Sequence, residues 1–205
     1  MKSATDVFSE WAQIGKDEGM ETGHSPAVRE ILDAALLELS GRHFKAIDAG
    51  CGNGWVVRLL NNIPSCDEAI GVDGADSMIE RAQTIDPQGK YILADLSTWN
   101  PESPIELVHS MEVLYYLEDI PKFLKRVHQH WLLADGVFAF GIDHYLENED
   151  CHGWSEKVGV RMAMYSEIEW RKMVEGAGFK ILRMFRAART AEWAGTLSFI
   201  LAKNH

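Results

Sequence analysis

The sequence is poor in cysteine and in basic residues, and it contains no long apolar run. Its 205 residues include 3 cysteines, none of them in a Cys-x-x-Cys pair. An odd number of cysteines without this spacing argues against a disulfide framework and against a zinc knuckle. We therefore expect free thiols in a reducing compartment, and no metal site.

The small number of lysines and arginines also restricts the partners. Only 20 of them stand against 31 aspartates and glutamates, which gives a net charge of −11. An acidic surface repels phosphate backbones, so we expect no nucleic acid partner and interpret the basic stretch 180–189 as a solvated strand edge. No apolar run approaches the roughly 20 residues of a membrane span, and residues 1–6 lack the apolar core of a signal peptide. These absences favour a cytoplasmic protein without membrane contact, and they leave both a monomer and a homodimer open.

What is present is a regular alternation of strand and helix patterns from residue 42 onward. Such alternation is typical of an α/β protein with a doubly wound, mostly parallel sheet. The length of 205 residues and the hydrophobic content of 46% suit a single domain with a full core. We predict strands over residues 44–49, 68–73, 91–96, 105–110 and 136–142.

The chain is organised around residues 46–60, which begin as an apolar strand. Three glycines follow within five residues, Gly50, Gly52 and Gly54, and an amphipathic run then resumes. Glycines let a backbone bend sharply and approach a ligand where a Cβ atom would clash, and the amides of the next helix point into that space. The stretch predicts a strand, a ligand-binding turn and a helix, and the alternative is a turn that binds nothing.

The spacing of these glycines separates two classes of cofactor. A dinucleotide fingerprint requires a third small residue where Trp55 stands, which disfavours NAD, FAD and a dehydrogenase. The pattern Asp48-x-Gly50-x-Gly52-x-Gly54 instead resembles motif I of the class I S-adenosylmethionine-dependent methyltransferases, of the small-molecule type. The resemblance covers about four-fifths of the chain.

The resemblance implies a division of the single domain, residues 1–205. Residues 1–40 would form a helical lid or cap, and residues 42–142 the cofactor-binding core. The irregular stretch 143–165 would be an acceptor-binding insertion, since connections this long are usually functional. Residues 166–205 would add a helix and a C-terminal antiparallel hairpin, completing a seven-stranded sheet with helices on both faces.

Two further acids end predicted strands of the core. Asp73 ends the second strand, where an acid can accept hydrogen bonds from both ribose hydroxyls, and a helix-capping aspartate is the alternative. In the family pattern, the acid that ends the third strand accepts a hydrogen bond from the adenine amino group. Asp95, followed by Leu96, matches that position, and a turn-forming aspartate is the alternative.

The segment after the fourth predicted strand, residues 111–117, resembles the corresponding segment of the family. Met111 and Glu112 would line the methionine end of the cofactor, and Tyr115 or Tyr116 would face the acceptor unless both are core aromatics. The resemblance thus implies one set of cofactor-binding residues: Asp48, Gly50, Cys51, Gly52, Asn53, Gly54, Asp73, Gly74, Met78, Asp95, Leu96, Met111 and Glu112.

The N-terminal residues 1–24 are polar, with a short helical pattern that three later glycines interrupt. They suit either an arm packed on the body of the protein or a moving lid whose His24 faces the ligand. A helix is predicted to begin at Ser25-Pro26, with Ser25 as N-cap and Pro26 in the first turn.

The resemblance implies binding of S-adenosylmethionine and in-line transfer of its methyl group to an O, N or other nucleophile, which leaves S-adenosylhomocysteine. An acceptor that carries a proton needs a base, for which His24, His144 and Tyr115 are candidates. No Asn/Asp-Pro-Pro-Tyr/Phe run follows the fourth strand, which argues against methylation of nucleic-acid bases. We expect a small-molecule acceptor, and the alternatives are a protein acceptor or a cofactor-binding module without transfer activity.

Overall fold

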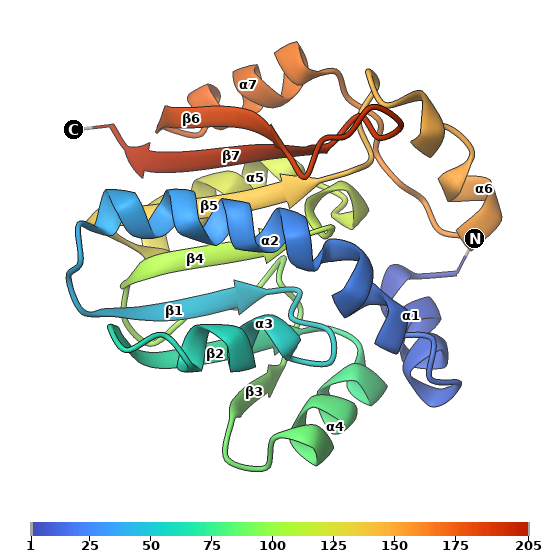
Figure 1. Ribbon diagram of the computed structural model, residues 1–205, viewed down its shortest axis with the longest axis horizontal. Helices are drawn as coiled ribbons and strands as arrows, with labels where there is room; N and C mark the ends of the chain where they lie inside the picture. Colours follow the sequence, from blue (N-terminus) through green and yellow to red (C-terminus); the bar gives the residue numbers. More distant parts are fainter. Residues whose placement is uncertain (1, 205) are drawn as a thin grey trace.

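The computed structural model describes residues 2–204 as a seven-stranded sheet between two layers of helices (Figure 1). The strand order is β3-β2-β1-β4-β5-β7-β6. The first five strands pair in parallel, and β7 runs antiparallel between β5 and β6. This arrangement confirms the predicted doubly wound sheet and its C-terminal antiparallel hairpin.

The strands and helices have the following bounds. The strands are Phe44–Ala49 (β1), Cys66–Asp73 (β2), Lys90–Leu93 (β3), Ile105–Met111 (β4), Leu132–Ile142 (β5), Phe179–Ala187 (β6) and Thr196–Lys203 (β7). The α-helices are Ala4–Gln13 (α1), Glu18–Leu39 (α2), Trp55–Asn61 (α3), Asp76–Ile85 (α4), Ile120–Arg126 (α5), Trp154–Val158 (α6) and Glu167–Gly176 (α7). Short turns of helix cover Leu114–Tyr116 (η1), Val127–Trp131 (η2) and Glu149–Cys151 (η3). Within residues 2–204, none of the helices combines the length and the apolar character that a bilayer crossing requires.

The prediction of a helix start at Ser25-Pro26 is wrong, because α2 begins two turns earlier, at Glu18. Pro26 lies inside the helix, where its missing N–H leaves one backbone hydrogen bond unmade. The early turns are held by Asp17, just before the helix, whose buried carboxylate accepts hydrogen bonds from Asn53 and Arg81. A tertiary contact here outweighs the local preference for a helix start at the proline.

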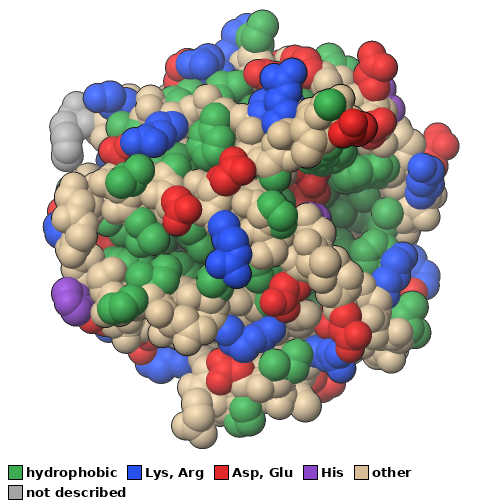
Figure 2. Space-filling view, viewed as in Figure 1, with side chains coloured by type: hydrophobic (Ala, Val, Ile, Leu, Met, Phe, Trp, Pro, Cys, Tyr) green, Lys and Arg blue, Asp and Glu red, His purple; other side chains and the backbone are tan. Residues whose placement is uncertain are grey.

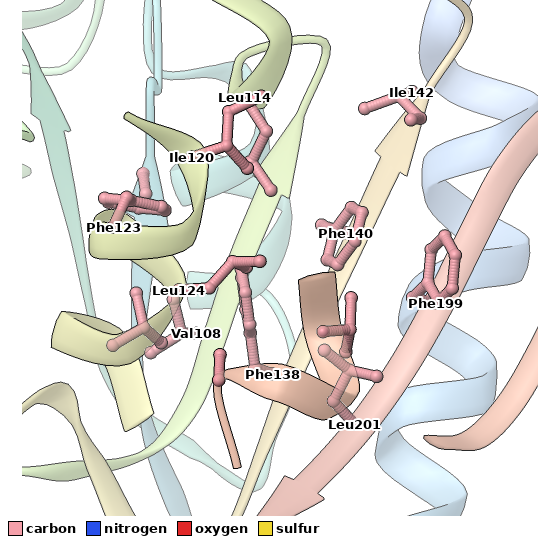
Figure 3. Packing of buried hydrophobic residues seen from close by; sticks show 14 of the residues in the cluster. Val108, Leu114, Ile120, Phe123, Leu124, Phe138, Phe140, Ile142, Phe199 and Leu201 are labelled. Atoms are coloured by element: carbon pink, nitrogen blue, oxygen red, sulfur yellow. The ribbon is translucent and has the colours of Figure 1, made fainter. Parts of the chain in front are cut away.

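Side chains of β5 point alternately to the two faces of the sheet and contribute to the core on both. Phe138 and Phe140 point to the face covered by α5 and α7, where Phe140 stacks on Phe199 of β7 (Figure 3). The intervening residues Val137 and Ala139 point to the face covered by α2 and α3. Because both faces are buried, β5 has the continuous apolar sequence that a central strand of such a sheet requires.

The carboxyl ends of β1, β4 and β5 lie at one edge of the sheet, beside α1 and α6 (Figure 1). In open α/β sheets, ligands bind in the crevice outside this edge, near the point where the strand order reverses. Figure 2 shows a hollow in the surface on the side to which these strands point, among hydrophobic and acidic side chains. The fold therefore indicates that a ligand would bind among the loops that follow these strands.

Candidate functional site

The turn after β1 is shaped by three glycines with left-handed backbone conformations. Their φ angles are 79° at Gly50, 52° at Gly52 and 78° at Gly54. A Cβ atom on Gly50 would lie 2.2 Å from Val113, and one on Gly54 would lie 2.3 Å from Tyr91. At Gly52 nothing is closer than 3.9 Å. Gly50 and Gly54 therefore allow close packing, whereas Gly52 borders open space.

Asp73, at the end of β2, connects this turn to the start of α4. One carboxylate oxygen accepts the backbone N–H of Gly52 at 2.9 Å, and the other accepts the N–H of Ala75 at 2.8 Å. Burial raises the pKa of Asp73, and these backbone bonds act against that shift. Each oxygen still has a lone pair free to accept a further hydrogen bond.

A cavity brings many of the predicted residues together. It is lined by residues from β1, the glycine turn, α3, α2 and β4: Met20, His24, Asp48, Gly50, Cys51, Gly52, Asn53, Trp55, Val56 and Met111. The segment predicted as a lid or arm thus contributes directly to the wall of the cavity that the glycine turn borders.

The N-terminal segment is fixed over this cavity by polar contacts. The Asn53 amide donates to Asp17 at 2.9 Å, and Arg81 donates to the same oxygen at 3.2 Å. In α1, Ser9 donates to Asp76 at 2.7 Å, at the start of α4. These contacts join helices α1 and α2 to the two loops that end β1 and β2.

Asp48 has a buried partner that the sequence did not reveal. Its carboxylate lies 2.7 Å from Nδ1 of His109, a residue of β4 that is 0% exposed. Because Nδ1 faces a carboxylate, it carries the proton and donates it. The pair joins neighbouring strands, since Asp48 and His109 are register partners.

Asp95 and Leu96 lie outside the strand that was predicted to contain them. Strand β3 ends at Leu93, and the exposed Asp95 accepts hydrogen bonds from the backbone N–H of Ser97 at 2.8 Å and from its hydroxyl at 2.7 Å. This local bond diverts the backbone into a turn and ends the strand. Leu96 is buried and belongs to the core cluster on the face of the sheet covered by α5 and α7.

Near His24 of the cavity wall, two acids follow β4 and β5. Glu112 has a φ of 60° and accepts a hydrogen bond from the Tyr115 hydroxyl at 2.6 Å and another from the backbone N–H of Asp143. Asp143 accepts from the Thr196 hydroxyl at 2.6 Å. One side-chain atom from each of His24, Glu112 and Asp143 lies within 4.8 Å of the others.

Burial shifts the pKa values of this group in opposite directions. It raises the pKa of Glu112 well above its usual value, and repulsion from Asp143 raises it further. Burial also raises the pKa of Asp143. Burial lowers the pKa of the His24 imidazole, and the attraction of Asp143 opposes that shift. Two acids and a largely neutral imidazole therefore meet at this edge of the sheet.

The other two candidate bases are buried behind this group. His144 is 1% exposed, its Nδ1 donates to the carbonyl of Ala163 at 3.2 Å, and its Nε2 has no partner among the described residues. Its ring centroid lies 5.2 Å from that of Tyr115. Burial raises the pKa of the Tyr115 hydroxyl, and nearby Glu112 adds to that shift. Of the three candidates, only His24 lines the cavity.

Comparison with known proteins identifies the family. A model for a methyltransferase domain matches residues 22–184. This chain belongs to the class I S-adenosylmethionine-dependent methyltransferases. The trans-aconitate 2-methyltransferases of Azoarcus sp. (strain BH72) and Methylobacterium radiotolerans are similar to it, at 32% identity over 125 residues and 37% over 91 residues. These matches cover 58% and 44% of this chain, but only 49% and 34% of the two relatives.

Solved structures of methyltransferases have the same fold. A putative methyltransferase in complex with the Haloferax volcanii Trm112 methyltransferase activator matches with a TM-score of 0.85 and 22% identity, over 100% of both chains. An S-adenosylmethionine-dependent methyltransferase from Clostridium acetobutylicum matches with a TM-score of 0.73 and 16% identity, over 96% of this chain and 98% of that one. A magnesium protoporphyrin IX methyltransferase from Synechocystis, of the same fold, was solved with bound S-adenosylmethionine. S-adenosylmethionine is thus the cofactor of this family.

The residues of the candidate site fit that cofactor. The open space at Gly52 has room for a ligand that a Cβ atom would obstruct, and Asp73 beside it retains acceptor capacity. Two other predicted cofactor residues border the turn and the strand after it. Met78 lies under Gly52, and Gly74 lies against Thr5 of α1.

Sequence reasoning missed two residues of this candidate site, Asp17 and Asp143. Asp143 directly follows β5, and Asp73 likewise stands at the carboxyl end of β2. An acid at the end of a predicted strand is therefore the signal that could have identified Asp143. Asp17 follows no strand, and no local pattern connects it to the glycine turn. Its role depends on the way the N-terminal segment folds back over the sheet.

Proposed function

We propose that this protein transfers the methyl group of S-adenosylmethionine to a small-molecule acceptor at the carboxyl edge of its sheet. The observation that carries the proposal is the cavity shared by the glycine turn and His24, which adjoins the acids Glu112 and Asp143. One cavity thus joins a cofactor-binding turn to groups that can orient an acceptor and accept its proton. The names of the trans-aconitate 2-methyltransferases support a small acceptor.

In this proposal the chain holds the cofactor with residues of three loops. The Asp73 carboxylate accepts hydrogen bonds from the ribose hydroxyls, while Gly52 leaves the space for that part of the ligand. Asp95 accepts a hydrogen bond from the adenine amino group, and Leu96 packs nearby. The methionine end lies toward Met111 and Glu112. The full set is the one named from the sequence, which includes Asp48, Gly50, Cys51, Asn53, Gly54, Gly74 and Met78.

Bound S-adenosylmethionine supplies the methyl group as part of a reactive sulfonium. The protein therefore contributes mainly position, and it removes a proton where the acceptor carries one. We assign the base to His24, because its imidazole lines the cavity and its lowered pKa keeps it ready to accept a proton at neutral pH. His144 and Tyr115 support the acceptor side from behind, through the Tyr115 bond to Glu112.

The N-terminal segment closes the site in this proposal. The contacts of Asp17 with Asn53 and Arg81 hold α2 over the glycine turn, and these contacts must open to admit a ligand of the size of the cofactor. Such closure excludes water from the reacting groups. Lid motion in residues 2–24 is therefore part of the proposed catalytic cycle.

Turnover with methyl-labelled S-adenosylmethionine tests the proposal. The purified chain is incubated with separate pools of small amines, alcohols and carboxylic acids and with a protein extract, and S-adenosylhomocysteine and labelled products are measured. We expect acceptor-dependent S-adenosylhomocysteine with a small-molecule pool. Label confined to the protein extract would instead indicate a protein methyltransferase, and cofactor binding without turnover on any pool would indicate a binding module.

A further inference from the structure

Two acids without a basic partner lie beside His24, a residue that lines the cavity. Glu112 and Asp143 follow adjacent parallel strands, and their side chains converge with His24 so that one atom of each lies within 4.8 Å of the others. Within residues 2–204, neither carboxylate has a lysine or an arginine at ion-pairing distance. Two acids thus face one uncharged imidazole.

The hydrogen bonds of these acids suit their ionised forms. Both oxygens of Glu112 accept hydrogen bonds, one from the Tyr115 hydroxyl and the other from the backbone N–H of Asp143. Asp143 accepts from the Thr196 hydroxyl. All of these partners can donate, and an ionised carboxylate is acceptor-only, so the network can accommodate two anions, whereas burial and mutual repulsion disfavour them. A cation placed between them would remove that conflict.

An aromatic wall lies directly beside the acids. The Tyr115 and Tyr116 ring centroids are 4.5 Å apart, and Phe8 of α1 lies 5.3 Å from Tyr116 at a steep angle. His144 extends the row on the other side of Tyr115. Aromatic faces attract organic cations, most strongly where water is excluded. The acids and the rings therefore favour the same kind of ligand.

We propose, on the basis of the proposed function, that the acceptor is a small organic amine that binds in its protonated form between Glu112 and Asp143. This makes the protein an N-methyltransferase. The net charge of −11 on the chain favours the approach of such a cation. A tricarboxylate such as trans-aconitate would bring three negative charges to two buried acids and is a poor fit for this site.

The reaction at this site balances as follows. The ammonium group loses one proton to the His24 imidazole, and the N–H electron pair becomes the lone pair of the amine. The amine nitrogen uses that pair to form a bond to the methyl carbon, while the carbon–sulfur bond breaks and its electron pair stays on sulfur. The products are a methylated ammonium ion and S-adenosylhomocysteine, and His24 then releases its proton to water.

Binding to the protein saturated with S-adenosylhomocysteine tests this inference. The probes are 2-phenylethylamine, 2-phenylethanol, 3-phenylpropionate and trans-aconitate, each titrated by calorimetry and by ligand-observed NMR, with and without EDTA. We expect the amine to bind at least about tenfold more tightly than its alcohol and acid counterparts. Equal or tighter binding of the alcohol or of either acid would overturn the inference, as would failure of the amine to bind.

Matched variants test whether Glu112 and Asp143 are responsible for the preference for the amine. Glu112→Gln and Asp143→Asn keep the side-chain shapes and should each weaken amine binding about tenfold. Asp143 is not among the proposed cofactor-binding residues, so Asp143→Asn should change the affinity for S-adenosylhomocysteine less than about twofold. Glu118→Gln, an exposed acid in the same loop, serves as the control and should change neither. Amine binding that survives Glu112→Gln, or that disappears with EDTA, would contradict direct contact with the acids. Failure of the wild-type protein to bind S-adenosylhomocysteine would count against the proposed function itself.

Discussion

Asp17 and Asn53 are separated by 36 positions in the chain, yet the Asn53 amide donates a 2.9 Å hydrogen bond to the Asp17 carboxylate. Asp17 is 0% exposed and immediately precedes α2, whereas Asn53 lies in the glycine turn after β1. This bond attaches the N-terminal segment to the part of the protein that we propose binds the cofactor. It also explains why α2 begins before the proline.

Removal of the Asp17 carboxylate should loosen the segment over the cavity. In Asp17→Ala we expect faster hydrogen exchange in residues 2–17 and an affinity for S-adenosylhomocysteine that is lower by about fivefold, because two hydrogen bonds to a buried charge are lost. Asp33→Ala, an exposed acid on the same helix, is the control. If both variants exchange at the wild-type rate, Asp17 does not hold the segment closed.

The two glycines Gly50 and Gly52 should respond differently to alanine. A Cβ atom on Gly50 meets Val113 at 2.2 Å, so Gly50→Ala should lower the melting temperature strongly. Gly52→Ala adds backbone strain of about 1–2 kcal/mol without a close contact, and it should mainly weaken S-adenosylhomocysteine binding, by about tenfold or more. Melting curves and calorimetry on both variants test this, and full cofactor affinity in a folded Gly52→Ala would contradict it.

The buried pair of Asp48 and His109 should contribute substantially to stability. His109→Ala leaves a buried carboxylate without its donor, which should reduce the free energy of unfolding by about 3 kcal/mol in urea titrations. The exposed pair of His43 and Asp67 has the same 2.7 Å separation and provides a matched control, His43→Ala, for which we expect little change. Equal losses in the two variants would show that burial does not determine the effect.

Glu112 should make stability depend on pH. Because its pKa in the folded protein is raised above the usual 4.5, the folded state binds its proton more tightly, and ionisation of Glu112 opposes folding. Its contribution to stability is therefore present near pH 4.5 and is lost as the pH rises through the folded pKa. Glu112→Gln should be more stable than the wild type at pH 7.5 by about 1 kcal/mol or more, an advantage that shrinks toward pH 4.5.

Urea titrations of the wild type, Glu112→Gln and the exposed control Glu118→Gln at both pH values measure this difference. An advantage of Glu112→Gln that stays constant or grows as the pH falls would contradict the raised pKa. The expected gain in stability accompanies the expected loss of amine binding, so the two experiments together ask whether this acid is retained for its ligand.

Local sequence signals predicted the elements that depend on local chemistry. Strand β1 has the predicted bounds and helix α3 follows the glycine turn as predicted, because an apolar strand, a glycine turn and an amphipathic helix each leave a local pattern. The capping box at the start of α7, formed by Ser166 and Glu169, is another pattern that is visible in the local sequence. The acids at the ends of β1 and β2 were visible because each follows an apolar run.

Features that depend on distant partners escaped prediction. The pair of Asp48 and His109 depends on the register of two parallel strands, and α2 starts early because Asp17 meets the glycine turn. Strand β3 is shorter than predicted because Asp95 bonds to Ser97 and turns the chain. The convergence of Glu112 and Asp143 required the order of β4 and β5 in the sheet, which a single strand pattern does not contain.

Calorimetric titration with S-adenosylhomocysteine tests the proposed cofactor site most directly. The wild type is compared with Asp73→Ala and with Asp67→Ala, an exposed acid at the opposite end of the same strand. We expect micromolar binding by the wild type and by Asp67→Ala, and a loss of at least about tenfold in Asp73→Ala, because both ribose hydrogen bonds disappear. Absence of heat with the folded wild type, or full affinity in Asp73→Ala, would contradict the proposed site.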